Sequence, residues 1–154
     1  MTLALEFLRA HRVSLSALTD FFSAIKIDDE TREFFHPHAF DELQAKKIIA
    51  DLGPDLYFVA LADSKVIAYG ILRGWAEGYS IPALGIAVRR DWRGKGIARQ
   101  LLSFLHFQAH LNGANSVMLK VDQRNSVAKN LYESEGYVFA KDQPGPQLVG
   151  YITL

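Results

Sequence analysis

The sequence predicts a mixed α/β fold, and three observations support this prediction. Short apolar runs with strand-like periodicity gather in hairpin-like pairs near the middle of the chain. Two amphipathic helical segments come later, and each lies between two predicted strands. The predicted order of elements is β-α-α-β-β-β-α-β-α-β-β, which indicates a mixed sheet rather than the strict alternation of a doubly wound fold.

The first third of the chain predicts one strand and two main helices. Apolar residues at a period of two indicate the strand, and apolar residues at helical spacing indicate the helices. Ser14 and Asp41 are the expected cap residues of these helices. In chain order, the expected elements are a strand over residues 2–9, a helix after Ser14, a short helical turn within 28–38, and a helix over 41–52.

The remaining two thirds of the chain predict a series of strands with two crossover helices. A long helix is expected from Gly96 to Leu111, and a shorter one is expected after a cap at Asn125 or Ser126. Gly136 is expected to end the shorter helix. The strands are expected over residues 57–62, 66–73, 83–88, 117–121, 137–140 and 148–154.

Length, charge and cysteine content restrict the class of protein. The 154 residues fit one domain, so we expect a single domain over residues 1–154. Lys and Arg number 17, as do Asp and Glu, so the basic excess of a nucleic-acid binder is absent. The lack of cysteine excludes disulfides, a thiolate nucleophile and a Cys-based zinc site. Glu6 and Arg9 interrupt the first apolar stretch, which makes it a poor signal peptide and a poor membrane span. We therefore expect a cytoplasmic protein with no membrane partner, and the balanced charge predicts no nucleic-acid partner.

The most informative segment is Arg93-Gly-Lys-Gly-Ile-Ala, which joins an apolar strand to the start of the long helix. The first turn of a helix has unpaired N–H groups and a partial positive charge. Glycines let the backbone approach an anion closely. The segment therefore predicts a phosphate site, with Lys95 and Arg99 adding positive charge at its rim.

Spacing separates this segment from two other phosphate-binding motifs. A P-loop requires Ser or Thr after Gly-Lys, but Lys95 is followed by Gly96. A dinucleotide fingerprint requires a third glycine, and Arg99 stands at that position. The remaining alternative is a helix that merely begins with two glycines, which is disfavoured because glycine lowers helix stability.

Two segments resemble the GNAT superfamily of N-acetyltransferases. Arg93-Gly-Lys-Gly-Ile-Ala is similar to the family's Arg/Gln-x-x-Gly-x-Gly/Ala signature. The segment from Asn125 to Tyr137 resembles the family's Asn-x-x-Ala-x-x-Leu-Tyr-x-x-x-Gly-Phe pattern, with Tyr137 in place of Phe. The element order resembles the family over the whole chain. The resemblance implies a mixed, mostly antiparallel sheet of about seven strands with a splayed parallel pair, flanked by about four helices.

The resemblance also implies a site for acetyl-CoA between the two splayed strands. Asn125 is expected to contact the cofactor near its pantetheine. The backbone of the first splayed strand is expected to bind the pantetheine arm, and the glycine segment is expected to bind the pyrophosphate. The implied cofactor-binding residues are Ile86, Ala87, Val88, Arg93, Gly94, Lys95, Gly96, Ile97, Ala98, Arg99 and Asn125.

Tyr132 is the implied general acid. Attack of an amine on a thioester expels a thiolate, and a phenol with a pKa of about 10 can supply the proton that this leaving group takes up. The alternative is that Tyr132 is a helix residue that packs on the core beside Leu131.

The family pattern leaves the general base unassigned. Some relatives place Glu on the strand before the Asn, but Lys120 stands there and is no base at neutral pH unless it is strongly desolvated. Candidate bases are Glu77, His36 and His38, each of which also has a purely structural reading as a loop or turn residue. The nearby aromatic residues could wall an acceptor pocket or belong to the core: Phe34, Phe35 and Phe40.

His106 and His110 lie at helical pair spacing, which raises the question of a metal site. A zinc protease requires Glu after the first His, but Phe107 follows, and a third ligand is not evident. We therefore expect no metal, and a solvated helix face carrying the two histidines.

The function implied by the resemblance is acetyl transfer from acetyl-CoA to a primary amine. The absence of cysteine favours direct attack in a ternary complex over an acyl-enzyme. A small-molecule amine is the first expectation for the acceptor, and a protein N-terminus or lysine is the alternative. A catalytically silent acyl-CoA-binding module is the non-enzymatic alternative. The sequence leaves open the length of the acyl group and whether the chain forms a homodimer.

Overall fold

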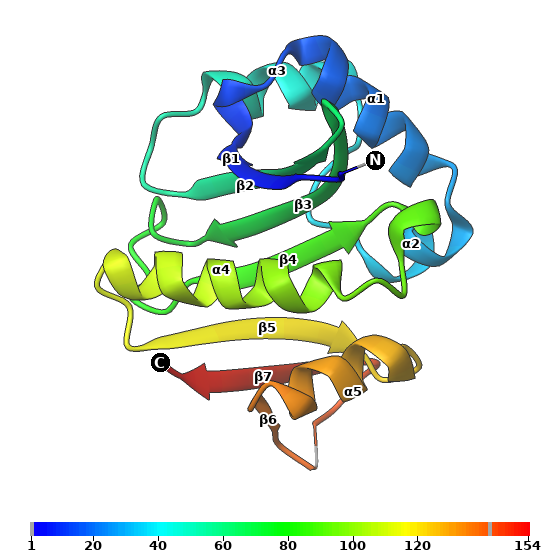
Figure 1. Ribbon diagram of the computed structural model, residues 1–154. Helices are drawn as coiled ribbons and strands as arrows, with labels where there is room; N and C mark the ends of the chain where they lie inside the picture. The colour runs from blue at the N-terminus through cyan, green and yellow to red at the C-terminus, as the bar shows by residue number, and fades with distance from the viewer. Residues whose placement is uncertain (1, 142) are drawn as a thin grey trace.

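The computed structural model describes residues 2–141 and 143–154, which contain one seven-stranded sheet. Along the sheet the order is β1-β2-β3-β4-β5-β7-β6, and all neighbours are antiparallel except β4 and β5 (Figure 1). The predicted mixed, mostly antiparallel sheet with one parallel pair is therefore confirmed. In chain order the strands are β1 (Leu5–Arg9), β2 (Leu56–Ala62), β3 (Lys65–Arg73), β4 (Ala83–Val88), β5 (Ser116–Asp122), β6 (Val138–Phe139) and β7 (Gln147–Thr153).

Five α-helices flank this sheet in the described part of the chain. One more is present than the resemblance implied, because the short turn expected near residue 30 forms α2. Two 3₁₀ turns precede α1 and α4, at Ala10–Arg12 and Arg90–Trp92. The α-helices are α1 (Leu15–Lys26), α2 (Asp29–Phe34), α3 (Glu42–Ala50), α4 (Ile97–Leu111) and α5 (Ser126–Ser134).

Three helix starts follow the capping rules that the sequence predicts. The side chain of Ser14 accepts a hydrogen bond from Ala17 N at 3.1 Å at the start of α1. Asp41 does the same for Gln44 N at 2.8 Å in α3. Asn125, rather than Ser126, is the cap of α5. Each cap satisfies one of the N–H groups that the first helical turn leaves unpaired.

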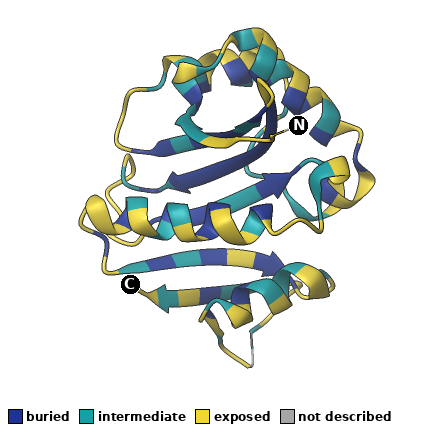
Figure 2. Cartoon of the chain, viewed as in Figure 1, coloured by how far each residue is buried: buried dark blue, intermediate teal, exposed yellow. Residues whose placement is uncertain are grey.

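The helices enclose two hydrophobic cores on opposite faces of the sheet. On one face, α4 packs with α5 against the sheet, and on the other α1 and α3 pack against β2 and β3. Burial is densest on β3, where only the two end residues are not buried (Figure 2). At Gly70 of β3, an added Cβ would lie 2.9 Å from the end of the Leu105 side chain of α4, so Leu105 would have to shift if this glycine were replaced.

Several elements differ in length from the prediction, β1 and β6 among them. β1 begins at Leu5 rather than residue 2, and β6 covers only Val138–Phe139 rather than residues 137–140. Tyr137 leaves the strand because its N–H donates to Tyr132 O at 3.0 Å and its ring is buried in the core. Within the described residues, no helix is long and apolar enough to cross a membrane.

Candidate functional site

The parallel pair of strands diverges almost as soon as it forms. β4 and β5 share one register pair, Ala83 with Met118, and Met118 N donates to Pro82 O at 3.0 Å. Beyond this pair the facing edges of the two strands are not joined in register. A cavity of about 790 Å³ lies at this splay, lined by both strands, by the start of α4 and by α5.

The edge of β4 that faces the splay carries main-chain groups that are not joined to β5. One of them, Val88 O, accepts from Arg93 Nε at 3.1 Å. Arg89 N donates to Ile67 O on β3 at 2.8 Å. Main-chain groups alternate in direction along a strand. Those of Ile86 and Val88 therefore point toward β5, while those of Ala87 point toward its β3 partner Tyr69. An extended ligand in the splay could pair with Ile86 and Val88 as an added strand would.

The glycine segment has a row of unpaired amides, and its residues from Gly94 to Arg99, except Lys95, line the same cavity. Gly94 and Gly96 have φ values of +73° and +81°, which L-residues with a side chain rarely adopt. The N–H groups of residues 94–99 have no acceptor among the described residues, and the first main-chain bond of α4 runs from Gln100 N to Gly96 O at 3.2 Å. These amides meet the requirement for an anion site at a helix N-terminus.

The arginines of this segment are bound to other parts of the chain. The Arg93 guanidinium donates to Asp28, and also to Thr31 Oγ1 at 2.6 Å. The Arg99 guanidinium is paired with Glu135 at the end of α5. The side chain of Arg93 thus holds the protein together, and a bound phosphate would be held by the amides instead.

Tyr132 lies in α5 and faces the cavity, where it is 8% exposed. Its ring meets that of Tyr137 edge-on at 5.7 Å, so it is also part of the core. Its hydroxyl makes no hydrogen bond to another described residue. Burial raises the pKa of Tyr132 to about 12, which keeps the phenol protonated at neutral pH.

Asn125 also lines the cavity, at the turn between β5 and α5. Its Oδ1 accepts from Ala128 N at 3.3 Å as the helix cap. A capping Asn leaves its amide NH₂ as the group available to a ligand.

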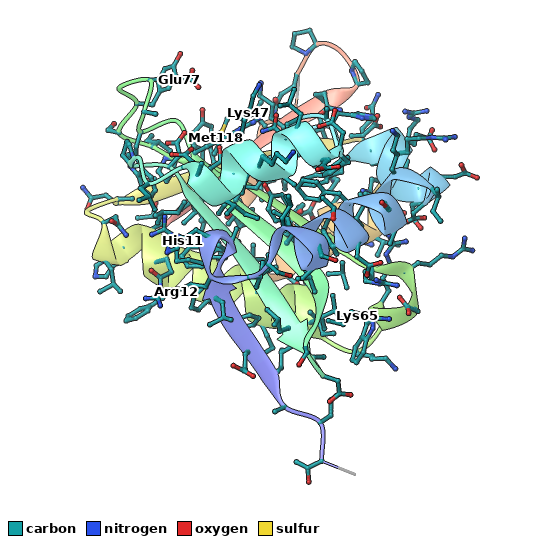
Figure 3. The ribbon with its side chains drawn as sticks, turned by 90° about the horizontal axis from the view of Figure 1, so that it is seen from above. His11, Arg12, Lys47, Lys65, Glu77 and Met118 are labelled. Carbon is teal, nitrogen blue, oxygen red and sulfur yellow. The ribbon has the colours of Figure 1, made fainter. Side chains whose placement is uncertain are left out.

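Of the three candidate bases, only His36 lines the cavity. Its Nε2 lies 2.9 Å from Glu33 O, so Nε2 carries the proton and Nδ1 is the potential acceptor. Glu77 lies on an exposed loop at the edge of the molecule, outside the lining (Figure 3).

His38 belongs to an aromatic cluster on the α1 face, outside the cavity lining. Its Nδ1 donates to Ala39 O at 2.7 Å, and its Nε2 lies 2.9 Å from the hydroxyl of Tyr69. Burial lowers the pKa of His38, which favours the neutral ring that this arrangement requires.

The side of the cavity next to α2 and the loop after it, called the acceptor side below, contains residues that sequence reasoning did not assign to the site. Phe34 and Phe35 line it, whereas Phe40 packs on Phe22 with ring centroids 5.3 Å apart. The alternation of β5 predicts that Met118 and Lys120 share a face, but only the sheet register shows what lies opposite them. The unassigned lining residues on this side include Pro37, Ile71, Arg73, Met118, Lys120 and Gln147.

The two histidines of α4 have different environments, which corrects the expectation of a solvated face. His110 is exposed, but His106 is half-buried, and its Nε2 lies 2.7 Å from the hydroxyl of Tyr137. Burial lowers the pKa of His106. In the described residues, no group of three His, Cys, Asp or Glu side chains is placed to hold a metal ion.

The splayed strands and the unpaired amides define a class of protein, one that holds an extended ligand with an anionic group. A family model for the acetyltransferase (GNAT) domain matches residues 53–139, which is more than half of the chain. The chain belongs to the GNAT acetyltransferase domain family.

Relatives of known name agree with this assignment. An acetyltransferase of Pectobacterium atrosepticum is 31% identical over 84 residues, which are 54% of this chain and only 58% of that protein's length. A putative acetyltransferase of Salmonella typhimurium, solved with its cofactor acetyl-CoA, has a TM-score of 0.73 and 16% identity, covering 100% of this chain and 95% of that one. The GNAT domain of S. lividans PAT has a TM-score of 0.77 and 16% identity, covering 100% and 92%.

Proposed function

We propose that the protein transfers an acetyl group from acetyl-CoA to the primary amine of a small molecule. The observation that carries this proposal is that one cavity is lined both by the glycine segment, whose amides are unpaired, and by the edge of β4 that is not joined to β5. The names of the relatives support it, as does the acetyl-CoA in the Salmonella structure.

The residues present fit acetyl-CoA. Its pyrophosphate would lie on the amides of residues 94–99, where Gly94 and Gly96 leave space that a Cβ would occupy. Its pantetheine amides would pair with the main chain of Ile86 and with the N–H of Val88, because Val88 O already accepts from Arg93 Nε. The ligand supplies an acetyl thioester, which this placement directs toward the closed end of the splay.

Tyr132 would donate a proton to the thiolate as the amine displaces it. Its hydroxyl is free of protein partners, and its raised pKa keeps it protonated. His36 is the lining residue suited to accept the proton that the amine loses, because its Nδ1 has no partner among the described residues.

A small molecule fits the acceptor side better than a folded protein does. α2 and the loop after it wall that side with Phe34, Phe35 and Pro37. A protein N-terminus or lysine side chain would have to thread past this wall as an extended segment. Acetylation of short peptides at rates above those of free amines would favour the protein acceptor instead.

The proposal is tested by measuring thiol release from acetyl-CoA with a panel of primary amines. We expect turnover with wild type and a loss of turnover in Tyr132→Phe, with coenzyme A binding retained in both. Binding of coenzyme A without turnover over the whole panel would instead identify an acyl-CoA-binding module. Failure to bind coenzyme A would refute both readings.

A further inference from the structure

Two cations without an anionic partner stand on the acceptor side of the cavity. Glu30, the one carboxylate in the described lining, is paired with Arg93 at 3.3 Å, and Arg99 is paired with Glu135. Arg73 and Lys120 also line the cavity, and neither forms an ion pair with any described residue. Within the described residues, no ion pair therefore neutralises either of these two lining cations.

The sheet register places these two cations at the closed end of the splay. Arg73 pairs with Ala83 across β3 and β4, and Ala83 pairs with Met118 across β4 and β5. Lys120 lies two residues after Met118, so its side chain points to the same face. Directly paired residues also share a face. Both cations thus lie on the same face of the sheet, the one next to α2. Arg73 lies on one side of the point where β4 and β5 part, and Lys120 lies on the other.

Contacts restrain Arg73 more than Lys120. Arg73 Nη1 donates to Pro37 O at 2.7 Å, which ties its side chain to the loop after α2 and leaves its other donors unassigned. Lys120 is exposed and has no hydrogen bond to a described residue. The pair combines the guanidinium of Arg73, which is held in place and has several N–H donors, with the flexible ammonium of Lys120. This arrangement suits a carboxylate or a phosphate.

We infer that the acceptor of this enzyme is an amine that also carries an anionic group, a carboxylate or a phosphate, bound by Arg73 and Lys120. The inference rests on the proposed function and names its substrate class. A polyamine would place a second cation against these two and is disfavoured. The same cations lower the pKa of a nearby acceptor ammonium, so that more of it is neutral and able to attack.

The test compares acceptors that differ only by the anionic group. Thiol release from acetyl-CoA is measured with 2-phenylethylamine against phenylalanine, propylamine against β-alanine, and ethanolamine against phosphoethanolamine. We expect kcat/KM to be higher for the anionic member of at least one pair by about 10- to 100-fold, the range of charge-assisted hydrogen bonds. The carboxylate and phosphate pairs show which anion is bound.

Variants then assign the preference to the two cations. Lys120→Gln and Arg73→Gln should each reduce the anionic-to-neutral ratio by about tenfold or more through acceptor KM, while KM for acetyl-CoA is unchanged. Lys65→Gln is the matched control, because Lys65 is an exposed cation at the far end of β3 from Arg73 and lies well away from Met118 (Figure 3). If Arg73→Gln does not fold, Lys120→Gln decides alone.

The outcomes separate this inference from the function on which it rests. Turnover with neutral amines as fast as with their anionic partners overturns the inference but keeps the acetyltransferase. An anionic preference that survives in Lys120→Gln also overturns it. If no amine releases thiol, the proposed function fails, and the acceptor class fails with it.

Discussion

The guanidinium of Arg93 donates to the carboxylate of Asp28, a residue 65 positions earlier in the chain. Thr31 Oγ1 donates to the same carboxylate at 2.6 Å, and Arg93 Nε donates to Val88 O at 3.1 Å. The side chain of Asp28 is 5% exposed. This network joins the glycine segment to α2, so the wall on the acceptor side and the proposed phosphate site are mechanically connected.

Asp28→Asn is expected to destabilise the protein by about 3 kcal/mol, because it leaves Arg93 facing a neutral amide in a largely buried position. Glu30→Gln is the matched control. Glu30 contacts the same arginine, but its side chain is 58% exposed, so its loss should change the free energy of unfolding by less than about 1 kcal/mol. Chemical denaturation of both variants measures the difference. Equal costs would mean that Asp28 is not the main anchor.

The contribution of Asp28 should also depend on pH. Burial by itself raises its pKa, but hydrogen bonds from Thr31 and Arg93 and the charge of Arg93 outweigh it and lower the pKa below the ordinary 3.8. A lowered folded-state pKa means that the stabilisation is complete above pH 3.8 and is lost as the pH falls through the folded value. Thermal unfolding should show a constant gap between wild type and Asp28→Asn at pH 5 to 7 and a smaller gap near pH 3.

Gly96→Ala is expected to weaken coenzyme A binding. Ala at φ +81° costs about 1–2 kcal/mol of stability, and its methyl group would stand beside the unpaired amides. Loss of one hydrogen bond to a charged phosphate would lower the affinity about tenfold or more. Gly113→Ala is the control, because Gly113 has φ +84° at the other end of α4 and lies outside the cavity lining. The two variants should lose similar stability, and calorimetry should show weaker coenzyme A binding in Gly96→Ala alone.

Tyr132→Phe is expected to lower kcat by about 10²- to 10⁴-fold with little change in stability, because the hydroxyl has no protein partner to lose. The raised pKa, about 12, adds a second expectation. The rate should rise with pH as the acceptor amine becomes neutral, and it should not fall again below about pH 11. A descending limb near pH 10 in conditions where the protein remains folded would contradict the assignment of Tyr132 as the acid.

His106 is expected to make stability fall as the pH drops below 6.5, the ordinary value for histidine. Its pKa is lowered by burial, so the unfolded chain binds more protons than the folded protein just below that pH. His106→Gln should therefore flatten the dependence between pH 7 and 5, and the half-buried His38 accounts for a remainder of the same sign. His110→Gln on the exposed side of α4 should retain the wild-type dependence.

Local patterns predicted most of the fold. The caps at Ser14 and Asp41 were correct, and Asn125 was one of the two candidates for α5, because a cap depends on residues three positions apart. The bounds of β4 were correct because Pro82 precedes the apolar run there and Arg89 and Arg90 follow it. The length of β6 was overestimated because Tyr137 is buried against α5. This is a tertiary contact, and it makes the strand begin only at Val138.

The candidate site was predicted less completely than the fold. The glycine segment could be recognised because its residues are consecutive, and Tyr132 could be recognised from its motif. Arg73 and Lys120 could not be assigned together, since they meet only through the pairing of β3, β4 and β5. His38 could not be placed in the aromatic cluster, because its partner Tyr69 lies 31 residues away.

The sequence alone determined the order of elements, their caps and the glycines with positive φ, because these depend on backbone preferences and on neighbours within a helical turn. The tertiary structure decided which polar groups remain available to bind a ligand. It bound Arg93 to Asp28 and His38 to Tyr69, and it left the amides of residues 94–99 unpaired at the cavity. Whether a polar group is available to a ligand depends on long-range partners, which strand register and helix packing bring together.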